Sequence, residues 1–167
     1  TDGLIAGTGS INGHLFPEEK SRAAVVHYDY TVLAGTQGHN NHKKQDRMYE
    51  LAKQFRIPLV LFGEGGGGRP GDDRSGSTVP GSTTTFKTFS QLSGLVPLVA
   101  ICNGRVFAGN TALVAACDVI IVTESTTIAM GGPAMIEGGG LGIYTPEEVG
   151  PLSFQEPNGV VGEVGSS

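Results

Sequence analysis

The chain contains an apolar run that leads directly into glycine, Ile57-Pro58-Leu59-Val60-Leu61-Phe62-Gly63-Glu64-Gly65-Gly66-Gly67-Gly68. A second stretch repeats the pattern, Val96-Pro97-Leu98-Val99-Ala100-Ile101-Cys102-Asn103-Gly104. Continuous apolar runs of this kind are typical of strands that are covered on both faces in a parallel sheet. Each stretch therefore predicts a buried strand that ends in a glycine turn.

Segments with helical character accompany these strands. Residues 40–55 carry apolar side chains at helical spacing, after an apolar strand at 23–28 and a glycine turn at 35–38. The other predicted elements are a turn at 102–107, helices at 84–92 and 108–116, strands at 119–122 and 127–130, strand character at 10–15 and 30–33, a polar loop at 71–82 and a helix start at Thr145. The repeated strand-turn-helix order predicts an α/β fold.

The glycine turns offer backbone N–H groups at the ends of neighbouring strands. Glycine lets an N–H group approach a ligand with no Cβ atom in the way, and it permits positive φ. Two such donors that converge on one carbonyl oxygen would form an oxyanion hole, worth about 3–4 kcal/mol per donor. A helix that begins at Gly109 would add its positive N-terminal dipole. The pair of turns points to acyl or enolate chemistry, and tight corners without a ligand are the alternative.

Composition sets limits on the class of protein. The 167 residues suffice for one domain with a core, and the net charge of −5 disfavours a general nucleic-acid surface. No apolar run approaches the roughly 20 residues that a membrane-spanning helix needs. Cys102 and Cys117 are predicted to be reduced core cysteines. Because the chain begins without Met and ends in Gly165-Ser166-Ser167, we expect it to be a fragment of something longer.

Other common sites fit the sequence less well. Residues 63–68 contain G-x-G-x-x-G, but a polyglycine run satisfies this dinucleotide fingerprint trivially, and Pro70 and a loop follow in place of a helix. The chain has neither a P-loop motif nor a G-x-S-x-G nucleophile motif. His39 and His42 lack further ligands in a metal-binding pattern, so we interpret them as exposed helix residues and predict no metal site.

From Asn103 onward the chain resembles the crotonase superfamily of acyl-CoA enzymes. The resemblance rests on Asn103-Gly104, Ala108-Gly109-Asn110, Ala112-Leu113, Cys117-Asp118-Val119-Ile120 and Met130-Gly131-Gly132-Pro133. It implies a crotonase-like superhelix of repeated ββα units, as a single acyl-CoA-binding domain over residues 1–167. It also implies that the N–H of Gly109 completes an oxyanion hole whose first donor lies within Gly65, Gly66 and Gly67.

The chain is more similar still to the carboxyltransferase subunits of biotin-dependent acyl-CoA carboxylases. The similar segments are Val25-Val26 through Gly35-Thr36-Gln37-Gly38, Glu64-Gly65-Gly66-Gly67, Gly132-Pro133 and Gln155-Glu156-Pro157-Asn158-Gly159-Val160-Val161, and the match spans about residues 9–161. Glu64 departs from this family, which has Ser at that position. The departure affects side-chain contacts at the turn and not the backbone donors.

Two alanines distinguish between branches of the superfamily. The resemblance aligns Ala112 and Ala134 with the two glutamates of enoyl-CoA hydratases, and alanine can neither activate water nor move a proton. Carboxyltransferases need no such base, because in that family carboxybiotin largely removes the proton as it releases CO2. The resemblance therefore implies transfer of a carboxyl group from carboxybiotin to the α-carbon of an acyl-CoA, with backbone amides that stabilise the enolate.

The resemblance also implies ligands and partners. Candidate contacts with the CoA cofactor are Gly35, Thr36, Gly38, Arg69, Arg105 and Asn110. The expected partners are acyl-CoA, biotin on a separate carrier domain or subunit, biotin carboxylase, a second carboxyltransferase domain and further copies in a homo-oligomer, with neither nucleic acid nor membrane. The expected compartment is the cytoplasm, or the mitochondrial matrix in a eukaryote. Because the second domain would lie outside this chain, we expect the chain alone to be inactive.

The sequence leaves two other functions open. The first is a stand-alone crotonase-like acyl-CoA decarboxylase or isomerase, which turnover without biotin would favour. The second is a non-catalytic acyl-CoA-binding module, which CoA binding that survives bulky substitutions at Gly66 and Gly109 would favour.

Overall fold

A six-stranded sheet forms the centre of the fold in the computed structural model, which describes residues 2–69 and 84–165. The strand order is β1 (Leu4–Ser10), β2 (Arg22–Tyr28), β3 (Leu59–Phe62), β4 (Leu98–Cys102), β6 (Val119–Thr123) and β8 (Glu163–Gly165). All neighbours are parallel except β1, which pairs antiparallel with β2. The predicted α/β fold is confirmed, and the predicted loop at 71–82 lies outside the described residues.

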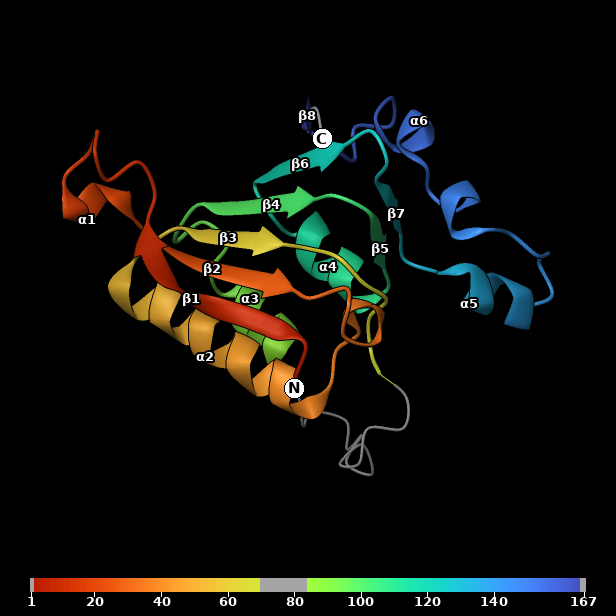
Figure 1. The fold of residues 1–167 in the computed structure, drawn as a ribbon, viewed down its shortest axis with the longest axis horizontal. Coiled ribbons are helices and arrows are strands. Elements are labelled where there is room, and N and C mark those ends of the chain that lie inside the picture. Colours follow the sequence, from red (N-terminus) through yellow and green to blue (C-terminus); the bar gives the residue numbers. More distant parts are fainter. Residues whose placement is uncertain (1, 70–83, 166–167) are drawn as a thin grey trace.

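A second, two-stranded sheet stands beside the first. It pairs β5 (Arg105–Phe107) with β7 (Thr127–Ala129) in parallel. Each strand follows a strand of the large sheet and precedes a helix, α4 (Gly109–Ala115) after β5 and α5 (Pro133–Gly138) after β7. The chain therefore makes two consecutive ββα units, which direct the start of α4 toward the ends of the central strands (Figure 1).

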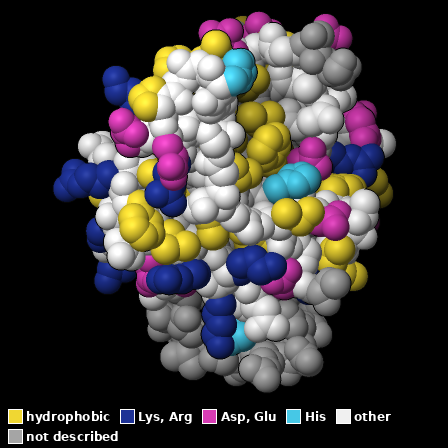
Figure 2. All heavy atoms as spheres, turned by 60° about the vertical axis from the view of Figure 1, so that its left-hand side comes forward, with side chains coloured by type: hydrophobic (Ala, Val, Ile, Leu, Met, Phe, Trp, Pro, Cys, Tyr) yellow, Lys and Arg dark blue, Asp and Glu magenta, His cyan; other side chains and the backbone are white. Residues whose placement is uncertain are grey.

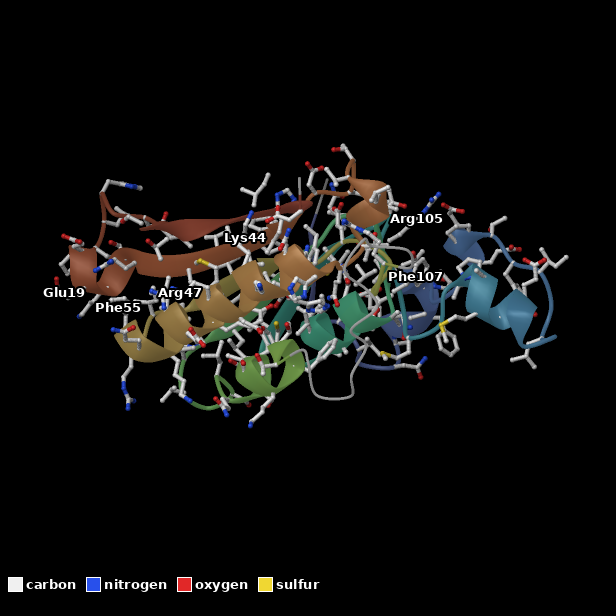
Figure 3. The ribbon with its side chains drawn as sticks, turned by 90° about the horizontal axis from the view of Figure 1, so that it is seen from below. Glu19, Lys44, Arg47, Phe55, Arg105 and Phe107 are labelled. Carbon is white, nitrogen blue, oxygen red and sulfur yellow. The ribbon has the colours of Figure 1, made fainter. Side chains whose placement is uncertain are left out.

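The longer helices lie on one side of the large sheet. α2 (His39–Phe55) packs against β1, β2 and α3 (Thr85–Ser90), and α4 lies on the same side (Figures 1 and 3). Alternate strand residues such as Val26, Leu61 and Ala100 face these helices and are fully buried. None of the helices among residues 2–69 and 84–165 is long and apolar enough to cross a membrane.

The opposite face of the large sheet is less covered. Its alternate residues on β2, β3 and β4 are half-buried, and among the described residues no helix packs over them. Ile5, Val25, His27 and Phe62 line a hollow on this face, where Figure 2 shows hydrophobic side chains gathered. The short elements α1 (Glu18–Ser21), η1 (Leu33–Gly35), η3 (Pro146–Glu148) and α6 (Leu152–Gln155) complete the fold.

Several local predictions differ from the structure. The strand predicted at 10–15 is wrong, because the N-terminal strand is β1 and ends at Ser10. Strand character at 30–33 is also wrong, because the Asp29 carboxylate accepts hydrogen bonds from the N–H and hydroxyl of Thr31 and closes a turn there. The turn predicted at 102–107 contains β5, and the helix start at Thr145 opens only η3, through a capping box with Glu148. Cys102 and Cys117 are free, as predicted.

Candidate active site

Three segments meet at the carboxyl ends of β2, β3 and β4, where ligands of open α/β sheets commonly bind. They are the turn around Gln37, the glycine run 63–68 and the start of α4. The N–H of Gln37 donates to the carbonyl of Gly67 at 2.6 Å, and the N–H of Arg69 donates to the carbonyl of Gln37 at 2.7 Å. The glycine run is therefore held against the turn around Gln37 by backbone hydrogen bonds.

The N–H groups of the glycine run are not equally free. Gly65 donates its N–H to the carbonyl of Arg105 at 2.8 Å, and Gly67 donates to Oδ1 of Asn110 at 3.2 Å. The N–H of Gly66 makes no hydrogen bond within residues 2–69 and 84–165, and Gly66 is exposed. Of the three predicted donors in this run, Gly66 is the one whose N–H is available to a ligand.

Gly109 is the first residue of α4 and lies directly beside the glycine run. A Cβ atom added to Gly67 would lie 2.8 Å from the backbone nitrogen of Gly109 and 2.6 Å from Cβ of Ala108. A Cβ atom on Gly109 itself would lie 3.0 Å from Oε1 of Gln37. The first N–H groups of a helix have no intrahelical partner, so Gly109 presents a second donor next to the run.

The predicted CoA contacts separate into two groups. Arg69 donates from Nε to Oγ1 of Thr36 at 3.2 Å and from Nη2 to the carbonyl of Thr36 at 2.9 Å. These two residues therefore lie together at the edge of the candidate site, next to the turn around Gln37. Arg105 instead forms an ion pair with Glu147 of η3, in the part of the chain that follows α5 (Figure 3). Gly35 and Gly38 belong to the turn around Gln37, and both are buried.

Asn110 is fully buried and its side chain is already used. Its Nδ2 donates to the carbonyl of Gly35 at 3.1 Å and to that of Glu64, and its Oδ1 accepts from the N–H of Gly67 at 3.2 Å. Both ends of the amide are therefore engaged inside the protein. The predicted contact of Asn110 with CoA would therefore have to use atoms other than its side-chain amide.

A buried polar network that the sequence did not predict connects the turn around Gln37 with α2. The hydroxyl of Tyr28 donates to Oε1 of Gln45 at 2.7 Å and accepts from Nε2 of Gln37 at 2.9 Å. Gln45 also accepts from the hydroxyl of Tyr49 at 2.9 Å and donates from Nε2 to Asn41. The signal was present in α2, where Asn41 and Gln45 share the helical spacing of the apolar residues that follow.

The Glu64 side chain adds a titratable group next to the glycine run. Partial burial raises the pKa of its carboxyl group above the ordinary value, against smaller opposing effects of His27 and of the Asn103 N–H. The two positions that the resemblance aligns with hydratase glutamates lie on α4, where Ala112 is half-buried, and on α5, where Ala134 is exposed. Among the described residues, no group of three or more His, Cys, Asp or Glu side chains could hold a metal ion.

Comparisons with known proteins show a family match over nearly the whole chain. The model of a family described as "Carboxyl transferase domain" matches residues 1–166. The Mycobacterium tuberculosis biotin-dependent 3-methylcrotonyl-coenzyme A carboxylase beta1 subunit is 30% identical over 151 residues, which cover 89% of this chain and 27% of that subunit. The chain spans about a quarter of the length of the first curated relatives that it matches.

Solved structures give the same result. A single-chain, multi-domain long-chain acyl-CoA carboxylase matches with a TM-score of 0.92 and 53% identity, over 99% of this chain and 16% of that one. The transcarboxylase 12S subunit, described as a hexamer with methylmalonyl-coenzyme A bound, matches with a TM-score of 0.81 and 26% identity, over 99% of this chain and 31% of that one.

Proposed function

The chain belongs to the carboxyl transferase domain family, and from this membership we propose that it forms the acyl-CoA side of the carboxyltransferase centre in a biotin-dependent acyl-CoA carboxylase. The proposed reaction moves a carboxyl group from carboxybiotin, presented by a carrier domain or subunit, to the α-carbon of an acyl-CoA. Residues 1–167 act as one domain in this proposal. A second carboxyltransferase domain supplies the rest of the site, so we expect the chain alone to transfer no carboxyl group.

The observation that carries the proposal is the pair of available N–H groups at Gly66 and Gly109. One lies on the exposed part of the glycine run and the other at the start of the helix that the run touches. Removal of the α-proton from a thioester places negative charge on its carbonyl oxygen. Two fixed backbone donors would stabilise that charge without a side-chain acid.

The surroundings of these donors support carboxyl transfer over hydration. The resemblance aligns Ala112 and Ala134 with the glutamates of hydratases, and these two alanines offer no carboxylate to activate water. Arg69, held by Thr36 at the edge of the candidate site, would contact a phosphate group of CoA and leave the glycine run free for the thioester.

A pair of substitutions at Gly109 tests the proposed donor. Proline is well accepted at the first position of a helix and lacks the N–H, whereas alanine keeps the N–H. Both substitutions add the Cβ atom near Gln37, and both are made in an Ala108→Gly background, which removes the methyl group that the proline ring would meet, so Gly109→Ala is the matched control. In the complete carboxylase, we expect Gly109→Pro to lower kcat for carboxyl transfer at least about 100-fold below Gly109→Ala. Equal kcat values in the two variants would exclude the Gly109 N–H as an oxyanion donor.

A long-chain acyl-CoA is the proposed substrate. The support is the 53% identity to the long-chain acyl-CoA carboxylase. Carboxylation rates measured with acyl-CoAs from acetyl to palmitoyl would test it, and a maximum at a short chain would contradict it. Turnover of a carboxylated acyl-CoA without biotin would instead favour a decarboxylase. A homo-oligomer and a cytoplasmic or mitochondrial compartment belong to the same proposal.

A further inference from the structure

Asn110 joins two turns that are distant in the sequence. Its Nδ2 bonds the carbonyl of Gly35, 75 residues away, and the carbonyl of Glu64, while its Oδ1 accepts from the N–H of Gly67. The side chain is completely buried. An amide with both ends satisfied inside the protein costs little to bury, whereas the loss of one partner leaves a buried polar group unpaired.

Asn110 forms hydrogen bonds with Glu64 and Gly67, the residues on either side of the Gly65-Gly66 pair that contains the available N–H donor of Gly66. The Glu64 carbonyl and the Gly67 N–H both point toward the Asn110 amide, and the Gly65 N–H points to the Arg105 carbonyl. Gly65 and Gly67 take φ of +108° and +78° between these fixed points. The N–H of Gly66 is the group in this segment that is left without a partner among the described residues.

Asn110 directly follows Gly109 in α4. The helix that presents the second donor therefore also carries the side chain that fixes the first. We infer that Asn110 is a positioning residue, which sets the separation of the Gly66 and Gly109 N–H groups so that both reach one substrate oxygen. This inference rests on the proposed function. Preorganised donors lose their effect when they shift from hydrogen-bonding distance of the developing charge.

The neighbouring residue offers a matched control. Thr111 is also buried, and its hydroxyl oxygen lies 2.9 Å from two carbonyl oxygens, those of Val106 and Ala129. These contacts tie α4 to the small sheet, and neither carbonyl belongs to the glycine run itself, although Val106 is paired with Gly65. Thr111→Val therefore removes a buried hydroxyl from the same turn of α4 and keeps the hydrogen bonds that Asn110 makes to Gly35, Glu64 and Gly67.

The test compares Asn110→Ala, Asn110→Asp and Thr111→Val with the unsubstituted complete carboxylase. We expect Asn110→Ala to lower kcat by about tenfold or more with KM for acyl-CoA within about threefold, whereas Thr111→Val stays within about twofold in kcat. Hydrogen exchange of the peptide over residues 63–68 should be faster in the Asn110 variants and unchanged in Thr111→Val.

The aspartate variant adds a pH readout. Its carboxyl group can accept from the Gly67 N–H, and it can donate toward the Gly35 or Glu64 carbonyl only when protonated. We therefore expect the kcat of Asn110→Asp, relative to the unsubstituted enzyme, to rise as the pH falls. A purely structural role would give no such recovery in kcat.

Three outcomes would overturn the inference. They are equal kcat losses in Asn110→Ala and Thr111→Val, a KM increase at unchanged kcat, and failure of the Asn110 variants to fold where Thr111→Val folds. Absence of carboxyl transfer in the unsubstituted enzyme would instead contradict the proposed function. In that case the exchange rates of residues 63–68 still decide whether Asn110 fixes the turn.

Discussion

Gly35 and Gly65 pack backbone against backbone. A Cβ atom added to Gly65 would lie 2.2 Å from the carbonyl oxygen of Gly35, and a Cβ atom added to Gly35 would lie 2.9 Å from the carbonyl oxygen of Glu64. Both glycines also have positive φ, +63° and +108° respectively. This contact requires glycine at both positions for steric and conformational reasons, and it sets the turn after β2 directly against the turn after β3.

Gly65→Ala should therefore be strongly destabilising. The new methyl group meets backbone atoms that cannot rotate away, and the residue keeps a left-handed φ, so we expect the free energy of unfolding to fall by about 3 kcal/mol or more. Gly68→Ala is the control, because a Cβ atom there has nothing within 4 Å. Urea unfolding of both variants measures the difference. A loss below about 1 kcal/mol in Gly65→Ala would show that the two turns can separate at little cost.

The parts of the fold that follow from local pattern were predictable. The run at 57–62 contains β3, and the helical spacing at 40–55 gave α2 within a residue at its start. β1 was missed because only Leu4 of this edge strand is buried, so the sequence carries little alternation. The hydrogen bond from Asn110 to Gly35 joins residues 75 apart, and no local pattern encodes it. Glycine is a local signal, so the proposed donors Gly66 and Gly109 could be named from the sequence, whereas the buried hydrogen bonds of the Asn110 amide could not.

Ala108 takes a backbone conformation that suits glycine better. Its φ is +52° and its ψ is −124°, immediately before the proposed donor Gly109. Ala108→Gly should remove this strain and raise the free energy of unfolding by about 1 kcal/mol. Ala112→Gly, inside the same helix, should lower it by about 1 kcal/mol, because glycine is a poor helix former there. Urea unfolding compares the two, and destabilisation of similar size in both variants would argue against strain at Ala108.

The two tyrosines of the buried network should differ in their energetic effect. Tyr28→Phe removes a hydroxyl that donates to Gln45 and accepts from Gln37, so the Gln37 amide loses this partner. We expect a loss of about 2 kcal/mol. Tyr49→Phe leaves Gln45 with its bond from Tyr28, so the expected loss is about 1 kcal/mol. Denaturant unfolding measures both. A larger loss in Tyr49→Phe would contradict the network as described.

The Glu64 carboxyl group gives the stability a pH dependence of known sign. Its pKa is raised by burial from the usual 4.5, so the folded state holds the proton more tightly than the unfolded state. Ionisation of Glu64 therefore penalises folding as the pH rises from below 4.5 through the raised pKa. Glutamine is uncharged and keeps an acceptor for the Asn103 N–H. Glu64→Gln should thus be more stable than the unsubstituted protein near neutral pH, and the gain should disappear as the pH falls toward about 4.

Glu147→Gln provides a contrast of opposite sign. Arg105 holds the pKa of the Glu147 carboxyl group below its usual value, so charge at Glu147 favours the folded state. The glutamine variant should be slightly less stable near neutral pH, and this loss should fade in acid. Urea unfolding at a series of pH values gives both differences relative to the unsubstituted protein, in which the effects of all other carboxylates cancel. If the Glu64→Gln difference were constant with pH, or grew in acid, burial would not control the titration of Glu64, and the side chain would have to lie in water beside the glycine run.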